Sequence, residues 1–253
     1  GATACAGVPV THRGEAVRVT LVTAHECAKG GGAQVRWDLL AQDRDGTLVG
    51  YMGVSRLAEV AERLVAAGMP ASTPAALIAQ GTTARQRTVV STLGGLHAAG
   101  VAAGIHPPAL FVIGPTVRHA AALDWFAARP LSGERLALFA PAGALRDALE
   151  VAGAEVLALA RPLGGAARVA LGAAPLTGVL LRSAEEVLAL EEERAAPWWG
   201  SRVRAWCLGE RAAARARELG WPEVVALPEA AGPQAVVEAL SGGGAAAARA
   251  RNA

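Results

Sequence analysis

Two short turns contain the residues best suited to binding a ligand. "YMG" (51–53) follows an apolar run, and "QGTTARQR" (80–87) follows "PAALIA". In open α/β sheets, ligands gather at the carboxyl ends of strands, where backbone N–H and C=O groups are free to bond. Gly81 would let a ligand approach the backbone closely, and Met52 offers a polarizable side chain suited to a flat heterocycle. We therefore predict a ligand site at these turns, with ordinary turn chemistry as the alternative.

The histidines give no metal-binding pattern. His25, Glu26 and Cys27 are consecutive, and neighbours in an extended stretch point to opposite faces, so the three cannot close on one ion. His106 and His119 have no partner at the H-x-x-x-H spacing. We therefore expect no metal site.

The glycine cluster Gly30–Gly32 is not a phosphate loop, because it lacks the G-K-[ST] ending and does not open a helix. A flexible surface loop is the better interpretation. The chain also lacks the G-x-S-x-G sequence of a nucleophile elbow. No catalytic residue can be assigned from these patterns.

The elements that position the two turns alternate between strand and helix. The first half contains five segments whose β-branched or apolar runs predict strands, with helices between them: 15–26, 47–53, 74–83, 85–100 and 107–126. This alternation predicts an α/β domain over residues 1–128.

The helix after the YMG turn has the clearest signals. Ser55 is a candidate N-cap, and Gly68 with Pro70 should end the helix. Glu59 and Arg63 are spaced to pair on the outer face. One face should be apolar: Leu57, Val60, Ala61, Leu64 and Val65.

A second series of predicted strands and helices follows a linker within 128–141, which contains Pro130, Ser132 and Gly133. Strands are predicted at 135–141, 154–162, 177–183, 202–209 and 222–228, and helices at 143–153, 184–196, 210–220 and 232–242. We therefore predict a second α/β domain over residues 129–242. The low-complexity residues 243–253 are expected to form a disordered tail.

Composition excludes several classes of protein. The net charge is +2 and the arginines are scattered, so we expect no nucleic-acid partner. Cys5, Cys27 and Cys207 are odd in number and form no C-x-x-C pair, which indicates reduced thiols in the cytoplasm. No apolar run approaches the ~20 residues of a membrane helix, so we expect no membrane partner.

Four segments in order carry a family resemblance: "AGVPVTHRG", "VTLVTAHE", "LVGYMG" through "QRTVVSTL", and "PPALFVIGPTVRHAAALDWF". From Ala6 to about Ala127 the chain resembles the C-terminal half of the uroporphyrinogen-III C-methyltransferases, in the tetrapyrrole methylase superfamily. The "YMG" and "GT…QR" turns together are the most specific part of this resemblance.

The resemblance implies a function. The family transfers methyl groups from S-adenosylmethionine to carbons of uroporphyrinogen III, giving precorrin-2, and the resemblance also suggests a homodimer. The residues matching its cofactor contacts are Met52 and Gly81, with the neighbouring Tyr51, Gly53 and Thr82. Those matching its "THR" motif, expected near the tetrapyrrole, are Thr11, His12 and Arg13. Arg13 could meet a carboxylate side chain. Gln86 and Arg87 match the family's "QR" without a defined role.

The family's first domain, with its GxGPGD loop and the other half of the cofactor pocket, would lie upstream of Gly1. Methyl transfer depends on holding an electrophile against a carbon nucleophile. We therefore expect the 253-residue chain alone to be inactive.

The second half resembles, more faintly, one of the two domains of a uroporphyrinogen-III synthase, which closes hydroxymethylbilane. Where that family has Thr-Ser after a strand, this chain has Arg182-Ser183, and its "GxxTA" turn is here Gly209–Ala213, without the Thr. Two alternatives remain open. The synthase-like domain is the active part, or the chain is a non-catalytic binding or assembly module.

Overall fold

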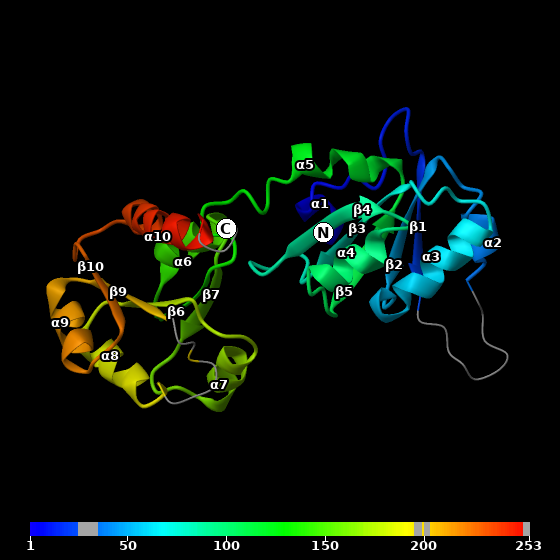
Figure 1. Ribbon diagram of the computed structural model, residues 1–253. Coiled ribbons are helices and arrows are strands. Elements are labelled where there is room, and N and C mark those ends of the chain that lie inside the picture. The colour runs from blue at the N-terminus through cyan, green and yellow to red at the C-terminus, as the bar shows by residue number, and fades with distance from the viewer. Residues whose placement is uncertain (25–34, 195–198, 200–202, 250–253) are drawn as a thin grey trace. The chain divides into compact units, whose positions relative to one another are not determined.

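The computed structural model describes residues 1–24, 35–194, 199 and 203–249. The chain folds into two compact units, Gly1–Ala128 and Arg129–Ala253 (Figure 1). The candidate metal residues His25–Cys27 and the glycine cluster Gly30–Gly32 lie outside the described residues.

Unit 1 is built on a five-stranded sheet. Its strands are β1 (Arg18–Thr23), β2 (Gly46–Tyr51), β3 (Pro74–Ala79), β4 (Arg87–Thr92) and β5 (Ala109–Ile113). Its helices are α1 (Ala2–Cys5), α2 (Trp37–Leu40), α3 (Leu57–Ala66), α4 (Leu96–Ala102) and α5 (Ala120–Leu123), with short 3-10 helices η1 (Val54–Arg56) and η2 (Pro115–His119).

The sheet of unit 1 is mixed, in the order β1-β2-β5-β3-β4. β1 and β2 are parallel, and β5 runs antiparallel between β2 and β3. β1, β2 and β3 therefore all end at one edge of the sheet, which we call the carboxyl edge. They begin at the opposite edge, the amino edge, where β5 ends.

Alternation along the strands gives unit 1 a core on each face of its sheet. Leu77 and Phe111 face one core, which the side chains of α3 and α4 complete. Ile78 and Val112 face the other, which is covered by the N-terminal segment and by residues of η2 and α5. Helices and coil on both faces thus bury the central strands and leave only the sheet edges accessible.

The helix α3 departs from its predicted start. Val54–Arg56 form η1, so α3 begins at Leu57 with Arg56 in the cap position, and Ser55 makes no cap bond. The predicted apolar face is buried except for Val65, which is 39% exposed. The predicted Glu59–Arg63 ion pair forms at 3.8 Å, although Arg56 makes the shorter contact with Glu59 at 2.8 Å.

Unit 2 contains a fully parallel five-stranded sheet. Its strands are β6 (Arg135–Phe139), β7 (Glu155–Leu159), β8 (Gly178–Leu181), β9 (Arg204–Leu208) and β10 (Glu223–Leu227). Its helices are α6 (Gly143–Val151), α7 (Gly165–Gly172), α8 (Ala184–Glu191), α9 (Glu210–Glu218) and α10 (Pro233–Arg249). The helix α7, flanked by glycines, was not predicted.

The strand order of unit 2 is β10-β9-β8-β6-β7. Numbered along this unit and read from the β7 edge, that is the doubly wound order 2-1-3-4-5. Side chains of α7, α8 and α9 pack into the core on one face, and those of α6 and α10 into the core on the other. The prediction of an α/β fold is confirmed for both units.

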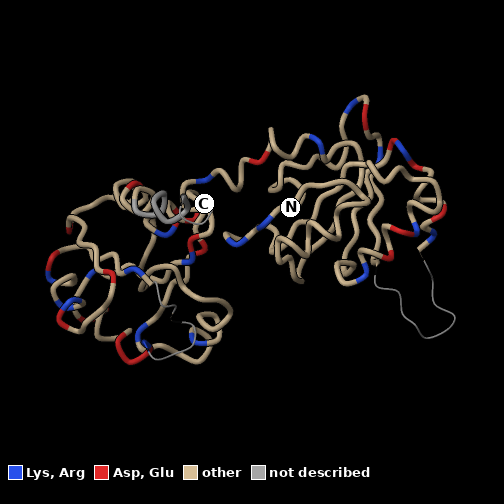
Figure 2. Tube along the Cα trace, viewed as in Figure 1, with Lys and Arg blue, Asp and Glu red and all other residues tan. Residues whose placement is uncertain are grey.

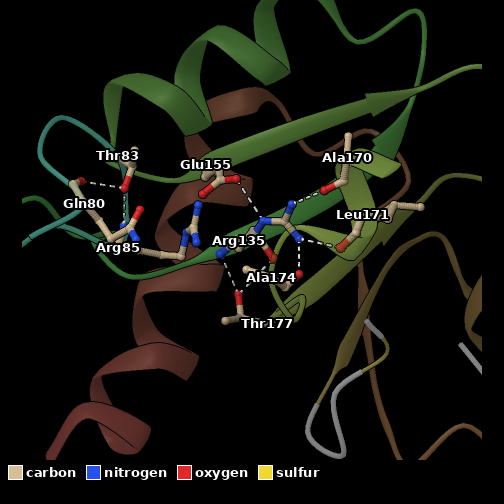
Figure 3. Close-up of polar contacts among 9 residues, drawn as sticks. All are labelled: Gln80, Thr83, Arg85, Arg135, Glu155, Ala170, Leu171, Ala174 and Thr177. Carbon is tan, nitrogen blue, oxygen red and sulfur yellow. Dashed lines mark hydrogen bonds and ion pairs between the residues drawn. The ribbon is translucent and has the colours of Figure 1, made fainter. Parts of the chain in front are cut away.

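A buried arginine joins α7 to this sheet. Arg135 is 2% exposed, and its guanidinium donates to the carbonyls of Ala170, Leu171 and Ala174 at the end of α7 and to Glu155 (Figure 3). A cation at a helix C-terminus satisfies carbonyls that have no partner within the helix. Arg135 therefore replaces a C-capping residue that the sequence of α7 does not supply.

The C-terminal segment differs from its prediction. The helix α10 continues through residues 243–249, where we expected a disordered tail; residues 250–253 are not described. The reason is the run of alanines at 245–248, since Ala has the highest helix propensity. Among the described residues, no helix is both long and apolar enough to span a membrane. Acidic and basic residues alternate along both units (Figure 2).

Candidate functional site

The two predicted turns lie on the carboxyl edge of unit 1, one on each side of the start of β5. The register pairs Tyr51 with Leu110 and Ala79 with Ala109. Met52 follows Tyr51, and Gln80 follows Ala79. These two residues therefore flank the same end of β5, the end at which it begins. The structure thus places on one edge two turns that are 28 residues apart in the sequence.

These turns contain unusual backbone conformations. In the described part of the chain, the residues other than glycine with positive φ are Met52 (53°), Gln80 (51°) and Thr82 (72°). The left-handed region costs such residues about 1–3 kcal/mol each, and strain of this kind concentrates at ligand sites. The strain therefore marks the turns chosen from the sequence and adds Gln80, which the sequence argument missed.

Hydrogen bonds within the 80–87 turn hold this conformation. The Gln80 carbonyl accepts from the Thr83 hydroxyl at 2.8 Å, and the Thr83 hydroxyl accepts from the Arg85 amide at 3.2 Å (Figure 3). The Gln86 side-chain oxygen accepts from the Thr82 amide at 2.8 Å. Gln86 thus has a definite structural role, because it fixes the backbone of the strained Thr82.

Gly53 and Gly81 are explained by packing within unit 1. A Cβ on Gly81 would lie 2.5 Å from the Cβ of Ala2, and one on Gly53 would lie 2.6 Å from the ring of Phe111. We expected Gly81 to give a ligand access to the backbone. The position that its Cβ would take is filled by Ala2, so the glycine allows α1 to pack against the turn, while Gly81 itself stays partly exposed.

The side chains of the first turn are open to solvent. Tyr51, the last residue of β2, is 46% exposed, and Met52, which follows it, is 64% exposed, although the centre of β2 is buried. Because these apolar side chains point outward, they add no buried surface to the core that would compensate for the strained backbone. Such an edge is suited to contact with a flat, partly apolar ligand.

The predicted substrate motif lies elsewhere in unit 1. Thr11, His12 and Arg13 precede β1, in a loop where Val17 donates to Asp45 just before β2, so they lie at the amino edge. The structure does not bring these residues together with the strained turns. It places His12 beside Glu15 and His119, a grouping that no spacing in the sequence indicates.

A cavity of about 270 Å³ also lies at the amino edge. Its walls include Thr47, Met69 and Pro74, and neither strained turn contributes to it. The carboxylate of Asp43 in its lining is held by Arg18 at 2.7 Å. We therefore place the candidate site at the turns, where strain and exposure coincide, and not at this cavity.

The carboxyl edge of unit 2 has the opposite character. In a doubly wound sheet the ligand crevice lies where the strand order reverses, here between β6 and β8. The Arg182 guanidinium donates there to the carbonyls of Phe139 (2.7 Å) and Pro141 (2.6 Å) and to Glu186 (2.8 Å). The unit's own side chain thus occupies the polar groups that a ligand would use.

Ser183, the hydroxyl retained from the synthase pattern, is also used within the fold. Its oxygen accepts from the Glu186 amide at 3.3 Å and caps α8. Gly209 has φ of 100° and caps α9 without a side chain. The Ser183 oxygen thus has a structural role in α8, and Gly209 has no hydroxyl to offer a ligand.

Known proteins resemble part of this chain. Residues 1–97 match the family model of the Tetrapyrrole (Corrin/Porphyrin) Methylases. Siroheme synthase 1 of Aeromonas salmonicida and the siroheme synthase of Chromobacterium violaceum are each 44% identical to it over 126 residues. In both cases the match covers 50% of this chain and 26% of the relative, so the chain spans about a quarter of the length of these relatives.

Among solved structures, the uroporphyrin-III C-methyltransferase of Thermus thermophilus, complexed with S-adenyl homocysteine, is 32% identical. The alignment covers 45% of this chain and 49% of that one, with a TM-score of 0.36. The family match includes both Met52 and Gly81.

Proposed function

We propose that unit 1 is the part of an S-adenosylmethionine-dependent tetrapyrrole C-methyltransferase that holds the cofactor along one side. The observation that carries the proposal is the left-handed backbone at Met52, Gln80 and Thr82. The methylase family match over residues 1–97 supports it, because both strained turns fall within the matched segment.

The proposed reaction moves two methyl groups in succession, each from the sulfonium of one S-adenosylmethionine to a ring carbon of uroporphyrinogen III, giving precorrin-2 and two molecules of S-adenosylhomocysteine. The carbon supplies the electron pair of the new bond, and the sulfur keeps the pair of the broken bond. Catalysis then consists mainly of holding donor and acceptor in line. The strained turns suit this task, since a backbone fixed before binding loses little further freedom.

We assign Met52, Gly81, Tyr51, Gly53 and Thr82 to the cofactor, and add Gln80. The side chains of Tyr51 and Met52 would cover the flat part of the cofactor, and the backbone of the second turn its polar part. Thr11, His12 and Arg13 remain proposed substrate contacts. Their place at the amino edge means that they would act separately from the cofactor turns.

S-adenosylhomocysteine binding tests the assignment. We expect addition of this product to shift the backbone amide NMR signals of Met52, Gly81 and Thr82 in the ¹⁵N-labelled chain. Calorimetry should show Met52→Ala binding about tenfold more weakly, equivalent to about 1.4 kcal/mol. Leu39→Ala removes a comparably exposed apolar side chain away from the turns and serves as the matched control. Equal affinity of Met52→Ala and wild type would refute the assignment.

For unit 2 we propose a non-catalytic binding or assembly role. The occupied switch point at Arg182 supports this role over the alternative of an active uroporphyrinogen-III synthase. The test is cyclisation of hydroxymethylbilane by the full chain. We expect only the uncatalysed isomer, and formation of uroporphyrinogen III above the rate without protein would favour the synthase.

We also propose a homodimer located in the cytoplasm, on the strength of the family resemblance and of the unpaired cysteine pattern. Sedimentation velocity of the purified chain tests the first part. A single boundary at the mass of one chain would contradict it.

A further inference from the structure

A cluster of three metal-ligating side chains lies at the amino edge of unit 1, apart from the cofactor turns. His12 and Glu15 come from the loop before β1, and His119 comes from the end of η2, 104 residues after Glu15. One ligand atom from each side chain lies within 4.8 Å of those of the other two. The fold therefore gathers a group that neither segment could form alone.

The separations are close to those of a coordination sphere. His119 Nε2 lies 2.8 Å from Glu15 Oε2, and His12 Nδ1 lies 3.9 Å from Glu15 Oε1. Ligand bonds of about 2.0–2.2 Å in a tetrahedron put neighbouring ligand atoms about 3.3–3.5 Å apart. The two measured separations lie on either side of that value. The two separations end on different oxygens of the same carboxylate, so side-chain rotations would bring both imidazoles and one Glu15 oxygen onto one ion.

The two imidazoles already lie side by side. The rings of His12 and His119 are stacked, with centroids 4.6 Å apart and planes inclined by 23°. Glu15 is 21% exposed and His119 is 27% exposed, whereas His12 is 44% exposed. The cluster is thus anchored in the protein on one side and reachable from solvent on the other, which gives an ion a path of entry.

Two groups compete with an ion here: the Arg13 carbonyl, 3.1 Å from His12 Nδ1, and the side chain of Arg118. Its guanidinium lies 3.1 Å from Glu15 Oε2, the same oxygen that contacts His119. Glu15 Oε1 points toward His12 instead, so the carboxylate can ligate an ion through Oε1 while Oε2 keeps Arg118. The Arg118 guanidinium would then orient the Glu15 carboxylate that binds the ion, as outer-shell partners do in metal sites.

We propose that His12, Glu15 and His119 form a binding site for one divalent transition-metal ion of the zinc class. Two imidazoles and one carboxylate suit Zn²⁺, Co²⁺ or Ni²⁺ better than Mg²⁺ or Ca²⁺, which prefer all-oxygen ligands. Three protein ligands leave a fourth position for water or a small ligand. The bound ion joins the N-terminal loop to the segment after β5.

Zinc titration of the untagged, chelator-treated full chain tests the proposal. We expect calorimetry to show one Zn²⁺ per chain, and Co²⁺ to give the visible absorption of tetrahedral coordination. His119→Leu should weaken Zn²⁺ binding at least about a hundredfold, the upper end of the loss from removing an outer-shell partner. The matched control is His106→Leu, which removes an exposed histidine elsewhere in unit 1 and should bind like wild type.

A second readout guards against misfolding of a variant. Zn²⁺ should raise the melting temperature of the wild type and not that of Glu15→Gln, a near-isosteric change that keeps the loop intact. Absence of Zn²⁺ binding by the wild type would overturn the site. So would binding that survives both variants and is lost in Cys27→Ser, because the ion would then lie elsewhere.

Discussion

The carboxyl edges of the two sheets differ in how their polar groups are used. In unit 1 the edge carries strained, exposed residues, with Met52 64% exposed and in the left-handed region. In unit 2 Arg182 and the 4% exposed side chain of Glu186 occupy the corresponding edge. Among the described residues of unit 2, positive φ is confined to glycines. The edge of unit 1 contains strained residues whose side chains are exposed. At the edge of unit 2, the polar groups bond to side chains of the same unit.

This difference teaches how to separate a binding edge from a structural one within a single chain. Both units are α/β, and both have the sheet edge at which ligands commonly bind. The fold alone would therefore predict a ligand site in each of the two units. The contacts of particular residues separate them, since unit 2 has already used the groups that unit 1 keeps available.

The largest expected effect comes from opening the filled edge. Arg182→Met removes the guanidinium that pairs with the buried Glu186, which keeps the bond from the backbone amide of residue 182, and leaves the carbonyls of Phe139 and Pro141 without this donor. Because the Arg182 side chain is itself 36% exposed, we expect a loss of about 2 kcal/mol in the unfolding free energy of unit 2, between the values for exposed and buried ion pairs. Urea unfolding monitored by tryptophan fluorescence measures this loss.

Arg146→Met is the matched control, because Arg146 pairs with Glu150 on the exposed face of α6. An exposed pair of this spacing contributes about 0.5 kcal/mol or less. If the Arg182 variant is no less stable than this control, unit 2 does not depend on its filled edge, and the comparison fails.

A smaller effect is expected at the open edge. Met52→Gly removes the strain of the left-handed residue, worth about 1 kcal/mol or more, and adds flexibility to the unfolded chain that offsets much of it. The unfolding free energy should therefore stay within about 1 kcal/mol of the wild type, on the stabilising side. Affinity for S-adenosylhomocysteine should fall nonetheless.

Met52→Leu keeps both the strained backbone and an apolar side chain, so it separates the two effects. It should leave stability unchanged and retain most of the affinity. A clear loss of stability in Met52→Gly would mean that the residue serves packing, and the distinction between the two edges would disappear.

The last effect appears only at high pH and concerns the interior of unit 2. Burial raises the pKa of the Cys207 thiol from 9.0 to about 11. The unfolded chain therefore loses this proton first, so the stabilisation is complete below pH 9 and disappears as the pH rises through about 11. Cys207→Ala should flatten that alkaline loss in urea unfolding between pH 8 and 11.

Alkylation followed by peptide mapping gives an independent check on the same thiol. At pH 8 the half-buried Cys5 should react with iodoacetamide well before Cys207. Reaction of both at one rate would show that unit 2 opens more readily than its buried network implies.

Much of the fold could be predicted from the sequence because its strands are distinct. Runs such as "TVVST" and "RLALF" are β-branched or apolar and are bounded by Gly or Pro. The strands of both sheets fall within predicted segments, except that β2 begins one residue earlier, at Gly46. Helix ends were less accurate, because Arg56 replaces Ser55 at the start of α3 and because the glycine-flanked α7 depends on Arg135 from another element.

The candidate site was only partly predictable. Strand exits identified Met52 and Gly81, but bulky residues rarely adopt positive φ, so nothing in the sequence indicated strain at Gln80. The contact of Glu15 with His119 joins residues 104 positions apart and depends on β5 running antiparallel. Pairings of that range follow from topology, which local patterns do not specify.

The antiparallel strand β5, between β2 and β3, fixes the distance between the two turns that a ligand would contact. Two interstrand steps separate the YMG turn from the 80–87 turn, a span of about 10 Å imposed by backbone hydrogen bonds. Side-chain substitutions cannot change that span. A ligand that touches both turns must be long enough to bridge the start of β5, so a smaller ligand can reach only one of them.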